Sequence, residues 1–435
     1  MAMAMVMLPD KVRDLSVAIG GVASAGQLLK TSNYEFRYLD ADPDQAAVAL
    51  LMPPSQSLTW REGELFAPMD QNMPEGDLFM RIRQLFPKQA LTPMHLLALI
   101  GRNGIGRLGY SLADVPAATP PPTISKAELV KTRYTPQVFD ELVAAYLSTG
   151  AGIAGIQPKI MVPDRPTVPI PSLIVKAGSA AYPGLAANEY LCLSAARSAG
   201  IDVTGNTLSD DGQVLILDRF DMVVHAEPGA NVRRVAQINQ ANQVDQVDRV
   251  ERLGFEDIAA LAGLRVREVL SDRKYQGSYQ RVAELLRQLQ LHAENLQRFF
   301  EQVAFSVMVR NGDAHLKNFG VLYRNASQVW LAPMYDVVTT SIYTYTRYPG
   351  GPELEDRTLA LKLFAGKHGS RAYPTTQELH DFGRRVCGVS QPARVLEAIA
   401  QGMSQTLAAA QSDERVPAPL LAQLRAAWDA GLSYA

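Results

Sequence analysis

The sequence predicts an α+β protein with a small amino-terminal unit, a middle unit that contains strands and a carboxyl-terminal unit dominated by helices. Three observations lead to this fold class. A chain of 435 residues exceeds the usual size of one hydrophobic core, which favours two or three packed units. Short apolar stretches at strand spacing occur before about residue 225, and helical periods dominate beyond it. A proline-rich segment separates the first unit from the second.

The composition is that of a folded globular protein. Hydrophobic residues make up 47% of the chain and charged residues 20%, which excludes wholesale disorder. The formal net charge is −2, so no global charge draws the chain toward nucleic acid or an anionic membrane. Any contact with nucleic acid is therefore expected to be local or supplied by a partner.

The cysteines and the apolar segments indicate the compartment. Cys192 and Cys387 lie far apart in helix-like sequence and form no C-x-x-C motif, so we interpret both as reduced core residues of a cytoplasmic protein. Met1–Leu8 lacks a preceding basic residue and a small-residue cleavage site, so we expect no signal peptide. No apolar run approaches the roughly 18 to 20 residues that span a bilayer, and no membrane contact is expected.

The amino-terminal unit is expected to comprise residues 1–123. Short apolar stretches alternate with turn residues from 11 to about 65, which favours a small strand-rich structure. From Gly76 to Leu112 the pattern is helical, and the glycine-punctuated segment Gly101–Arg107 lies near its end. The proline-rich segment Asp114–Thr123 has no apolar period, and we interpret it as the linker to the second unit.

The second unit is expected to comprise residues 124–224. Pro136–Leu147 has the pattern of a helix that ends at Gly150, and Asn188–Ser198 is predicted to form another helix. Short continuous apolar runs predict strands, and they lie at Ile160–Val162, Leu173–Val175 and Val214–Leu217.

The third unit is expected to comprise residues 225–435, where helical periods dominate. Apolar residues from Leu296 to Met308 follow i, i+3, i+4, i+7 spacing, which predicts a buried helix that delivers the next residues at its end. Arg394–Ala410 and Pro419–Ala430 are rich in alanine and leucine and are also predicted helices. We interpret Tyr343–Pro352 as a mobile loop.

The segment Asn311–Phe319 carries the most informative chemical signal. It places a carboxylate, an imidazole, an ammonium and an amide within six consecutive positions directly after an apolar helix. Phosphoryl transfer requires a base that orients a hydroxyl and hard oxygen ligands for magnesium. Asp313 and Asn318, five residues apart, supply both, so we predict Asp313 as the base and Asn318 as a metal ligand.

A second carboxylate is expected to join this pair. Phe319–Tyr323 and Gln328–Leu331 flank a polar turn and predict a hairpin that leads directly to Asp336. Such a hairpin carries Asp336 back beside Asn318, facing the same metal between the phosphates of ATP. The alternative interpretation is structural, with Asp313 as a helix cap and Asp336 as a turn residue.

His315 and Lys317 stand in the same loop. A lone histidine is more often structural than catalytic, but this position favours contact with a nucleotide. The chain contains six histidines and none lies four residues after His315, so a histidine-based metal site is disfavoured.

A glycine-rich segment precedes the strands of the second unit. Gly150–Gly155 matches G-x-G-x-x-G, which is a weak signal by itself. A dinucleotide fold requires a strand before the glycines and a helix after them, whereas here a helix precedes and extended chain follows. We favour a loop whose backbone N–H groups and Lys159 approach phosphates, with a flexible turn after a helix as the alternative.

Lys176 and Glu189 form a candidate pair. Lys176 ends an apolar strand and Glu189 lies at the start of the next helix, which is the order found in protein kinases, while a surface salt bridge is the alternative. Leu215–Asp221 is a strand that stops at charged residues where a hinge between two lobes is expected. Its backbone is suited to pair with an adenine edge, with Phe220 packing on the ring or filling the core.

The order of these segments resembles that of the HipA toxins. The residues that carry the resemblance are Gly152–Lys159, Ile174–Lys176, Asn188–Tyr190, Asp218–Asp221, Gly312–Asn318 and Pro333–Asp336. Gly76–Phe79 and Gly104–Gly109 also resemble the small amino-terminal subdomain of that family, so the resemblance covers most of the chain.

The resemblance implies a two-lobed fold of the protein-kinase type, related to phosphatidylinositol kinases, with a small amino-terminal subdomain and a helical carboxyl-terminal lobe. It implies that Asp313 accepts the proton of the substrate hydroxyl and that Asn318 and Asp336 hold magnesium. The residues assigned to ATP binding, with Glu189 as the partner of Lys176, are Ala154, Gly155, Ile156, Gln157, Pro158, Lys159, Lys176, Glu189, Asp218, Arg219, Phe220, His315, Leu316, Lys317, Asn318, Tyr335 and Asp336.

The resemblance also implies partners. HipA toxins phosphorylate protein hydroxyls, with aminoacyl-tRNA synthetases among their targets, and pair with a HipB-like helix-turn-helix antitoxin that recruits them to operator DNA. We therefore expect a growth-restraining serine/threonine protein kinase that uses ATP and magnesium and reaches DNA mainly through the antitoxin. Two alternatives stay open: a small-molecule phosphotransferase, since antibiotic kinases use a similar Asp-to-Asn loop, and a non-catalytic corepressor.

One position departs from the family pattern. HipA toxins often carry a serine in the glycine-rich loop, and its autophosphorylation switches the enzyme off. The aligned residue here is Gly152, so this switch is in doubt. Ser148 and Thr149 stand nearby, and replacement of that serine by either of them is a hypothesis.

Overall fold

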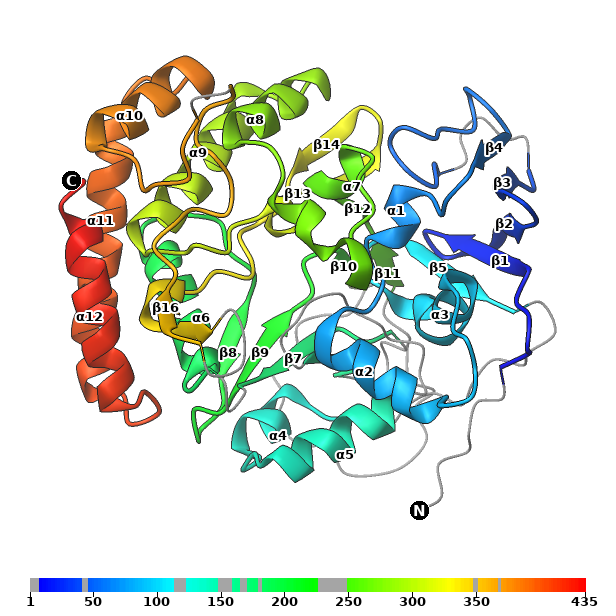
Figure 1. The fold of residues 1–435 in the computed structure, drawn as a ribbon, viewed down its shortest axis with the longest axis horizontal. Coiled ribbons are helices and arrows are strands. Elements are labelled where there is room, and N and C mark those ends of the chain that lie inside the picture. Colours follow the sequence, from blue (N-terminus) through cyan, green and yellow to red (C-terminus); the bar gives the residue numbers. More distant parts are fainter. Residues whose placement is uncertain are drawn as a thin grey trace.

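A computed structural model describes residues 8–40, 46–112, 123–147, 159–164, 170–178, 182–225, 249–346, 351–366 and 369–435. Helices and strands are mixed along the chain, as expected for an α+β protein, and the helices near the carboxyl terminus lie on the side of the molecule away from β1–β5 (Figure 1). Within these described residues, no helix is both long enough and apolar enough to cross a membrane.

The first unit contains a five-stranded antiparallel sheet in the order β4-β3-β2-β1-β5. Buried residues alternate along β1, which is the pattern of a sheet with one face against a core. Helices α1, α2 and α3 follow the first four strands in the chain. The bounds are β1 Asp14–Ile19, β2 Val22–Lys30, β3 Tyr34–Tyr38, β4 Thr59–Glu62, α1 Ala67–Asp70, α2 Gly76–Leu85, α3 Pro93–Ile100 and β5 Leu108–Ser111.

The prediction of helical structure up to Leu112 is wrong at its end. Residues Leu108–Ser111 form β5, which pairs antiparallel with β1. Gly106 has a φ of +91°, a conformation that side chains disfavour, and it allows the chain to turn into the sheet. A Cβ at Gly109 would lie 2.9 Å from the carbonyl oxygen of Arg102, so the close return of the chain also requires glycine.

The second unit contains a four-stranded antiparallel sheet in the order β6-β7-β9-β8, which confirms the three strands predicted here. Helices α4 and α5 precede it, and α6 joins β7 to β8. The predicted helix Pro136–Leu147 has these same bounds as α5. The bounds are α4 Lys126–Lys131, α5 Pro136–Leu147, β6 Lys159–Val162, β7 Leu173–Ala177, α6 Leu185–Ser198, β8 Asn206–Leu208 and β9 Val214–Asp218.

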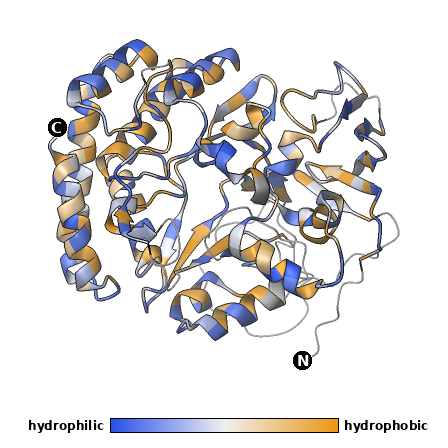
Figure 2. Cartoon of the chain, in the orientation of Figure 1, coloured by the Kyte–Doolittle hydropathy of each residue, from blue (hydrophilic) through white to orange (hydrophobic). Residues whose placement is uncertain are grey.

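The strands of this second sheet are buried on both faces. Val175 and Ile216 belong to the core that they share with the first unit, whereas Ile174 and Leu215 belong to the core of the helical part. Burial of both faces explains why these strands read as continuous apolar runs. Figure 2 shows β7 and β9 as hydrophobic strands, while helices such as α11 and α12 carry both hydrophilic and hydrophobic residues.

The third unit is more strand-rich than the sequence predicts. β10 and β11 pair with each other, and β12, β13 and β14 form an antiparallel sheet in that order. β13 and β14 confirm the predicted hairpin, whereas β11 and β12 were not predicted because each is four residues long and carries charged residues. The bounds are β10 Met222–His225, β11 Arg249–Arg252, β12 Gly254–Asp257, α7 Ile258–Leu261, β13 Gly320–Asn325 and β14 Gln328–Leu331.

Helices and one short strand pair form most of the remaining described part of the third unit. α11 contacts α6, α9 and α12, so the last helices pack on the second unit as well as on their own. The predicted mobile loop Tyr343–Pro352 contains β15, which pairs with β16 directly after the loop, and residues 347–350 of it lie outside the described part. The bounds are α8 Tyr279–Gln288, α9 Ala293–Met308, β15 Thr344–Thr346, β16 Glu353–Glu355, α10 Thr376–Asp381, α11 Pro392–Ala409 and α12 Ala418–Leu432.

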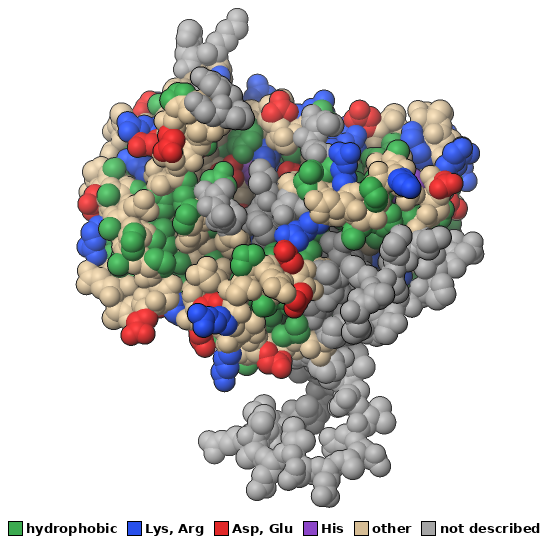
Figure 3. Space-filling view, turned by 60° about the horizontal axis from the view of Figure 1, so that its bottom comes forward, with side chains coloured by type: hydrophobic (Ala, Val, Ile, Leu, Met, Phe, Trp, Pro, Cys, Tyr) green, Lys and Arg blue, Asp and Glu red, His purple; other side chains and the backbone are tan. Residues whose placement is uncertain are grey.

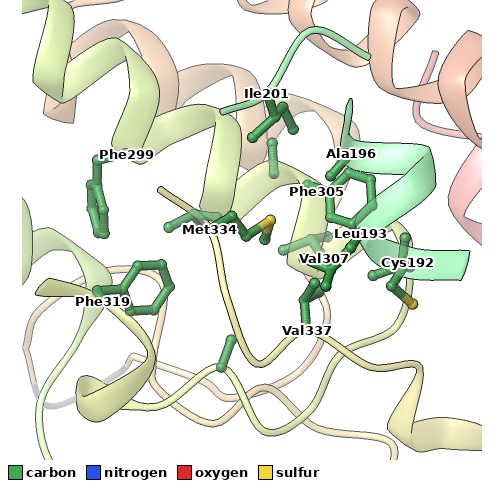
Figure 4. Packing of buried hydrophobic residues seen from close by; sticks show 14 of the residues in the cluster. Cys192, Leu193, Ala196, Ile201, Phe299, Phe305, Val307, Phe319, Met334 and Val337 are labelled. Carbon is green, nitrogen blue, oxygen red and sulfur yellow. The ribbon is translucent and has the colours of Figure 1, made fainter. Parts of the chain in front are cut away.

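The buried helix α9 packs against the segment Asn311–Phe319, which contains the predicted base and metal ligand. Phe299 on α9 meets Phe319 edge to face, with ring centroids 5.3 Å apart. Figure 4 shows Met334 lying between this aromatic pair and Phe305, so the segments on both sides of the β13–β14 hairpin rest on one core. A close-packed core resists displacement, and it therefore fixes the positions of the loops above it.

Candidate active site

A cavity of about 830 Å³ lies where the three units meet. Its volume is in the range of small-molecule and cofactor pockets. The described residues that line it include Gln71, Asn72, Glu75, Lys159, Ile174, Lys176, Glu189, Leu217, Asp218, Phe220, Phe255, Asp257, Lys274, Tyr275, Asp313, His315, Lys317, Asn318, Tyr335, Asp336 and Asp356. The cavity thus gathers residues from distant parts of the sequence, from Gln71 to Arg371.

The loop that follows α9 places Asp313 in the wall of the cavity. The helix ends at Met308, and Arg310 has a φ of +59°, which turns the chain away from the helix axis. The backbone N–H of Asp313 donates to Asn311 Oδ1 at 3.0 Å, and Tyr275 Oη donates to Asp313 Oδ1 at 2.6 Å. Burial raises the pKa of the Asp313 carboxyl above its ordinary value, and the hydrogen bond from Tyr275 opposes this shift.

Asn318 and Asp336 are neighbours, as the hairpin predicts. Asn318 Nδ2 donates to the backbone carbonyl oxygen of Asp336 at 3.4 Å, and Asn318 Oδ1 accepts from the backbone N–H of His315 at 3.1 Å. Asp336 has a φ of +52°, which is strained for a residue other than glycine and is characteristic of functional sites. The structure therefore brings the amide and the second carboxylate to one wall of the cavity.

Lys176 joins two carboxylates inside the cavity. Its Nζ lies 2.6 Å from Glu189 Oε1 and also contacts Asp336 Oδ1, while Lys159 Nζ lies 3.7 Å from Asp336 Oδ2. The Lys176 and Glu189 side chains are 3% and 1% exposed, so the alternative of a surface salt bridge is wrong.

These contacts set the protonation of the cluster. Burial alone would raise the pKa of Asp336, but Lys159 and Lys176 hold it well below its ordinary value. Burial alone would lower the pKa of Lys176, but Asp336 and Glu189 raise it. Asp336 is therefore an ionised carboxylate and Lys176 an ammonium at neutral pH.

An aromatic wall lies on another side of the cavity. Phe220 and Tyr335 stack with centroids 5.1 Å apart, and Phe255 meets Phe220 edge to face at 5.3 Å. Tyr335 Oη donates to the backbone carbonyl oxygen of Lys317 at 2.9 Å, which ties this wall to the loop of Asp313. Flat apolar faces of this kind suit the ring of a nucleobase.

The remaining residues of the 313–318 loop differ in their surroundings. His315 is buried, its Nδ1 has no hydrogen-bond partner among the described residues, and burial holds its pKa well below the ordinary value, so the imidazole is neutral. Lys317 lines the cavity and is ion-paired with Glu75. Leu316 is buried in the hydrophobic core and is not a cavity-lining residue.

Asp218, Arg219 and Phe220, at the end of β9, also differ in the surroundings of their side chains. Phe220 and Asp218 line the cavity, and Asp218 Oδ1 accepts from Lys126 Nζ at 2.9 Å. The Arg219 guanidinium instead donates to Asp221 and to the backbone carbonyl oxygens of Asn103, Gly104 and Pro171, all outside the cavity lining. Any contact between Arg219 and a nucleotide must therefore come from its backbone.

The predicted phosphate-binding loop lies outside the described residues. This applies to Ala154, Gly155, Ile156, Gln157 and Pro158, and also to Gly152, Ser148 and Thr149. Lys159, the first described residue after the loop, begins β6 and is buried against Asp336.

Several cavity residues were not predicted from the sequence. Glu75 comes from the first unit, Asp257 caps α7 through its Oδ1, and Lys274 and Tyr275 end a short 3₁₀ helix over Glu268–Tyr275. Burial raises the pKa of Asp257 to about 6. None of the four stands in a motif or at a strand end with a chemical partner nearby in the sequence, so only the fold reveals them.

Comparison with known proteins identifies the family of this chain. The family model described as the HipA-like C-terminal domain matches residues 151–411, and the model of the HipA N-terminal domain matches residues 15–111. The chain therefore belongs to the HipA family, which confirms the resemblance seen in its motifs.

Individual relatives are distant. The protein named "Putative kinase Y4dM" from Sinorhizobium fredii is 29% identical over 187 residues, which are 40% of this chain and 38% of that protein. The protein named "Putative kinase" from Haemophilus influenzae is 26% identical over 237 residues, which are 51% of this chain and 60% of that protein. The matched part of this chain thus spans less than two thirds of either curated relative.

A solved structure shares the fold over nearly the whole chain. It is that of the Shewanella oneidensis MR-1 toxin–antitoxin system HipA, HipB and its operator DNA complex, with a TM-score of 0.61. The match covers 97% of this chain and 96% of the other chain at 15% sequence identity. At this identity the likeness establishes the fold.

Proposed function

We propose that this chain is a serine/threonine protein kinase that transfers the γ-phosphoryl group of ATP in the presence of magnesium. The observation that carries the proposal is the Lys176 ammonium, which joins Glu189 and Asp336 in a cavity that also contains Asp313 and Asn318. Protein kinases require a strand lysine paired with a helix glutamate, a metal-binding aspartate and a loop with a base and an asparagine. The kinase names of two relatives support this choice.

The proposed fold is two-lobed and kinase-like, with the β6-β7-β9-β8 sheet and α6 in one lobe and the helices after residue 250 in the other. The nucleotide would lie between them, with its base against Phe220 and Tyr335 and its phosphates toward Lys159 and Lys176. Residues 154–158, Glu189, the 218–220 backbone and His315–Asn318 complete the proposed nucleotide site.

The oxygens of Asn318 and Asp336 fit a magnesium ion. Asp336 is held ionised by its lysine neighbours, and the Asn318 side chain donates to the backbone carbonyl oxygen of Asp336 in the same cavity wall. Oxygen ligands at such a site are those that magnesium prefers, and two protein ligands suffice when phosphate oxygens supply others. Bound magnesium would neutralise negative charge on the phosphates.

Asp313 would orient the substrate hydroxyl and accept its proton as the new O–P bond forms and the bond to the β-phosphate oxygen breaks. Tyr275 donates to Oδ1 of this carboxylate, so Oδ2 is the oxygen proposed to accept from the hydroxyl. Because burial raises the pKa of Asp313, the carboxylate is a better proton acceptor than an exposed aspartate.

A HipB-like helix-turn-helix antitoxin is the proposed partner, because the matched Shewanella HipA is in a complex with HipB and operator DNA. In the face shown in Figure 3, acidic and basic side chains are interspersed among the described residues, and they form no continuous basic field there. This distribution favours operator DNA binding through the antitoxin. An aminoacyl-tRNA synthetase is the first protein substrate to test.

The proposal is tested by replacing the proposed base. Asp313→Ala should lower phosphate transfer from radiolabelled ATP to protein by at least about 1,000-fold, because base positioning and electrostatics supply most of the catalysis in this reaction class. The substrates are lysate proteins, a purified aminoacyl-tRNA synthetase and, for the phosphotransferase alternative, aminoglycosides. Asp202→Asn, at a carboxylate that is 55% exposed and paired with Arg298, is the control and should retain full activity.

Each outcome separates the alternatives. Magnesium-dependent labelling of protein by the wild type, lost in Asp313→Ala, supports the kinase. Labelling of the aminoglycoside in place of protein identifies a small-molecule phosphotransferase. Absence of ATP turnover by the wild type, with and without the antitoxin, identifies a non-catalytic corepressor. Full protein labelling by a folded Asp313→Ala variant contradicts the role of Asp313.

A further inference from the structure

The first unit contributes a wall of the cavity, although none of its residues was predicted to take part in the chemistry. Gln71 and Asn72, after α1, and Glu75, before α2, all line the cavity. Gln71 Nε2 donates to the carbonyl oxygen of Phe255 at 2.8 Å, and its Oε1 accepts from the N–H of Asp257 at 3.1 Å. One side chain thus pairs with the edge of β12 as a neighbouring strand would, which holds residues 71–75 in place.

Glu75 is a buried carboxylate that contacts two lysines of the third unit. It is 3% exposed, its Oε1 is ion-paired with Lys317 Nζ, and its Oε2 lies 3.7 Å from Lys274 Nζ. Both lysines also line the cavity, and their side chains are 10% and 5% exposed. A buried ammonium is costly without a counter-charge, so Glu75 determines where these two cations can lie.

The role of Glu75 differs from that of an ordinary helix cap. It stands at the N-cap position of α2, but its side chain makes no capping hydrogen bond. Its Oε2 has no hydrogen-bond partner among the described residues, since the distance to Lys274 exceeds hydrogen-bond length. The carboxylate therefore interacts with the lysines of the cavity and does not cap the helix that it precedes.

The two lysines flank the loop of the proposed base. Lys317 is four residues after Asp313, and its carbonyl oxygen is fixed by Tyr335. Lys274 precedes Tyr275, the residue that donates to Asp313. Both lysines line the cavity that also contains Asp313, where negative charge would be redistributed during phosphoryl transfer.

We infer that Glu75 is a positioning residue, through which the first unit holds Lys317 and Lys274 in register with Asp313 for phosphoryl transfer. The inference rests on the proposed kinase function. It gives the first unit a part in catalysis: the lysines are preorganised only when residues 71–75 are docked on β12. Without the Glu75 charge, both ammonium groups gain freedom to move onto the ground-state phosphates or onto Asp336.

Glu75→Gln tests the inference because it keeps the size of the side chain and removes its charge. Preorganised charge acts mainly on the transition state, so kcat should fall about 10-fold or more while KM for ATP changes by less than about 3-fold. A merely structural loss would lower the amount of folded protein and leave both constants of the folded fraction unchanged.

Asp70→Asn is the matched control. Asp70 is also a buried carboxylate of the first unit, and its Oδ1 is paired with Arg267 of the third unit at 2.9 Å, but it does not line the cavity. The control should lower the melting temperature at least as much as Glu75→Gln does and change kcat by less than about 2-fold. A third variant, Lys317→Met, shows whether Glu75 acts through its lysine: Glu75→Gln should have a smaller effect in that background.

The results distinguish this inference from the proposed function. If the wild type transfers phosphate and Glu75→Gln retains its kcat, Glu75 is not a positioning residue, and the kinase function stands. If Asp70→Asn lowers kcat as much as Glu75→Gln, docking of the first unit alone explains the loss, and the inference is overturned. If the wild type transfers no phosphate, the proposed function fails first.

Discussion

Two buried clusters of charge lie at opposite ends of the paired strands β7 and β9, and they contribute to the molecule in different ways. Lys176, near one end, joins Glu189 and Asp336. Arg219, just beyond the other end, is paired with Asp221, and both side chains are fully buried. In the sequence the two look alike, since each is a basic residue at the end of an apolar strand.

The difference lies in how completely the charges are satisfied. The Arg219 guanidinium donates to Asp221 and three backbone carbonyl oxygens, and Asp221 Oδ2 also accepts from the N–H of Gly106 at 2.7 Å. This cluster has little capacity left and fastens the first unit to the second. The Lys176 cluster borders a cavity, and the Asp336 side chain remains 34% exposed. A charged group that is largely buried but borders a cavity can still bind a ligand there.

The largest effect on phosphate transfer is expected at the Lys176 cluster, which borders the cavity. Asp336→Asn removes the proposed metal-binding charge and leaves the Lys176–Glu189 pair in place, so phosphate transfer should fall at least about 1,000-fold. Initial rates with radiolabelled ATP measure the effect, and thermal unfolding of the same sample should show a folded protein. A variant that keeps more than a tenth of wild-type activity would show that Asp336 has no catalytic task.

At the fully buried Arg219–Asp221 cluster, a substitution should lower stability and leave phosphate transfer nearly unchanged. Asp221→Asn leaves the Arg219 guanidinium buried with a neutral partner, which should lower the free energy of unfolding by about 3 kcal/mol. Denaturant unfolding measures this loss, and phosphate transfer per folded molecule should stay within about 2-fold of the wild type. Unchanged stability together with lost activity would place Arg219 and Asp221 in the nucleotide site after all.

A smaller effect is expected at Glu256, a buried carboxyl next to the cavity residue Asp257. Burial raises the pKa of Glu256 to about 7, although hydrogen bonds from the N–H of Leu50 and from Tyr323 Oη oppose the shift. The folded state therefore binds a proton that the unfolded state releases between its ordinary value near 4.5 and about 7. Stability contributed by this group falls as the pH rises through that window.

Glu256→Gln keeps an oxygen for both hydrogen bonds and removes the titration. At pH 8 the variant should be more stable than the wild type by about 3 kcal/mol, and near pH 4.5 the difference should disappear. Denaturant unfolding across this pH range gives the answer. Equal pH slopes for the two proteins would show that Glu256 titrates near its ordinary value.

Much of the fold could be predicted because its strands and helices carry strong local patterns. The apolar runs at Ile160–Val162 and Val214–Leu217 lie in β6 and β9 as predicted. The helical spacing from Leu296 to Met308 lies in α9. The prediction failed at β11, β12 and β5. β11 and β12 are short, charged strands whose partners are distant in the sequence, and β5 depends on Gly106 to turn into the first sheet.

The candidate site could be predicted where its chemistry is contiguous in the sequence. Asp313 and Asn318 share a loop, and the hairpin argument brought Asp336 beside Asn318. Glu75, Asp257 and Lys274 could not be found in this way, because their function depends on partners that only the packing of the three units brings together. Arg219 shows the converse: its place in a family motif gave no indication that its side chain fastens two units.

Calorimetric titration of the wild-type chain with a non-hydrolysable ATP analogue, with and without magnesium, tests the central claim most directly. A single site with a micromolar dissociation constant is expected, weakened at least about 10-fold when magnesium is left out or when Asp336→Asn replaces the wild type. Absence of binding heat with both components present, or affinity that depends neither on the ion nor on Asp336, would contradict the assignment of this cavity to nucleotide and metal.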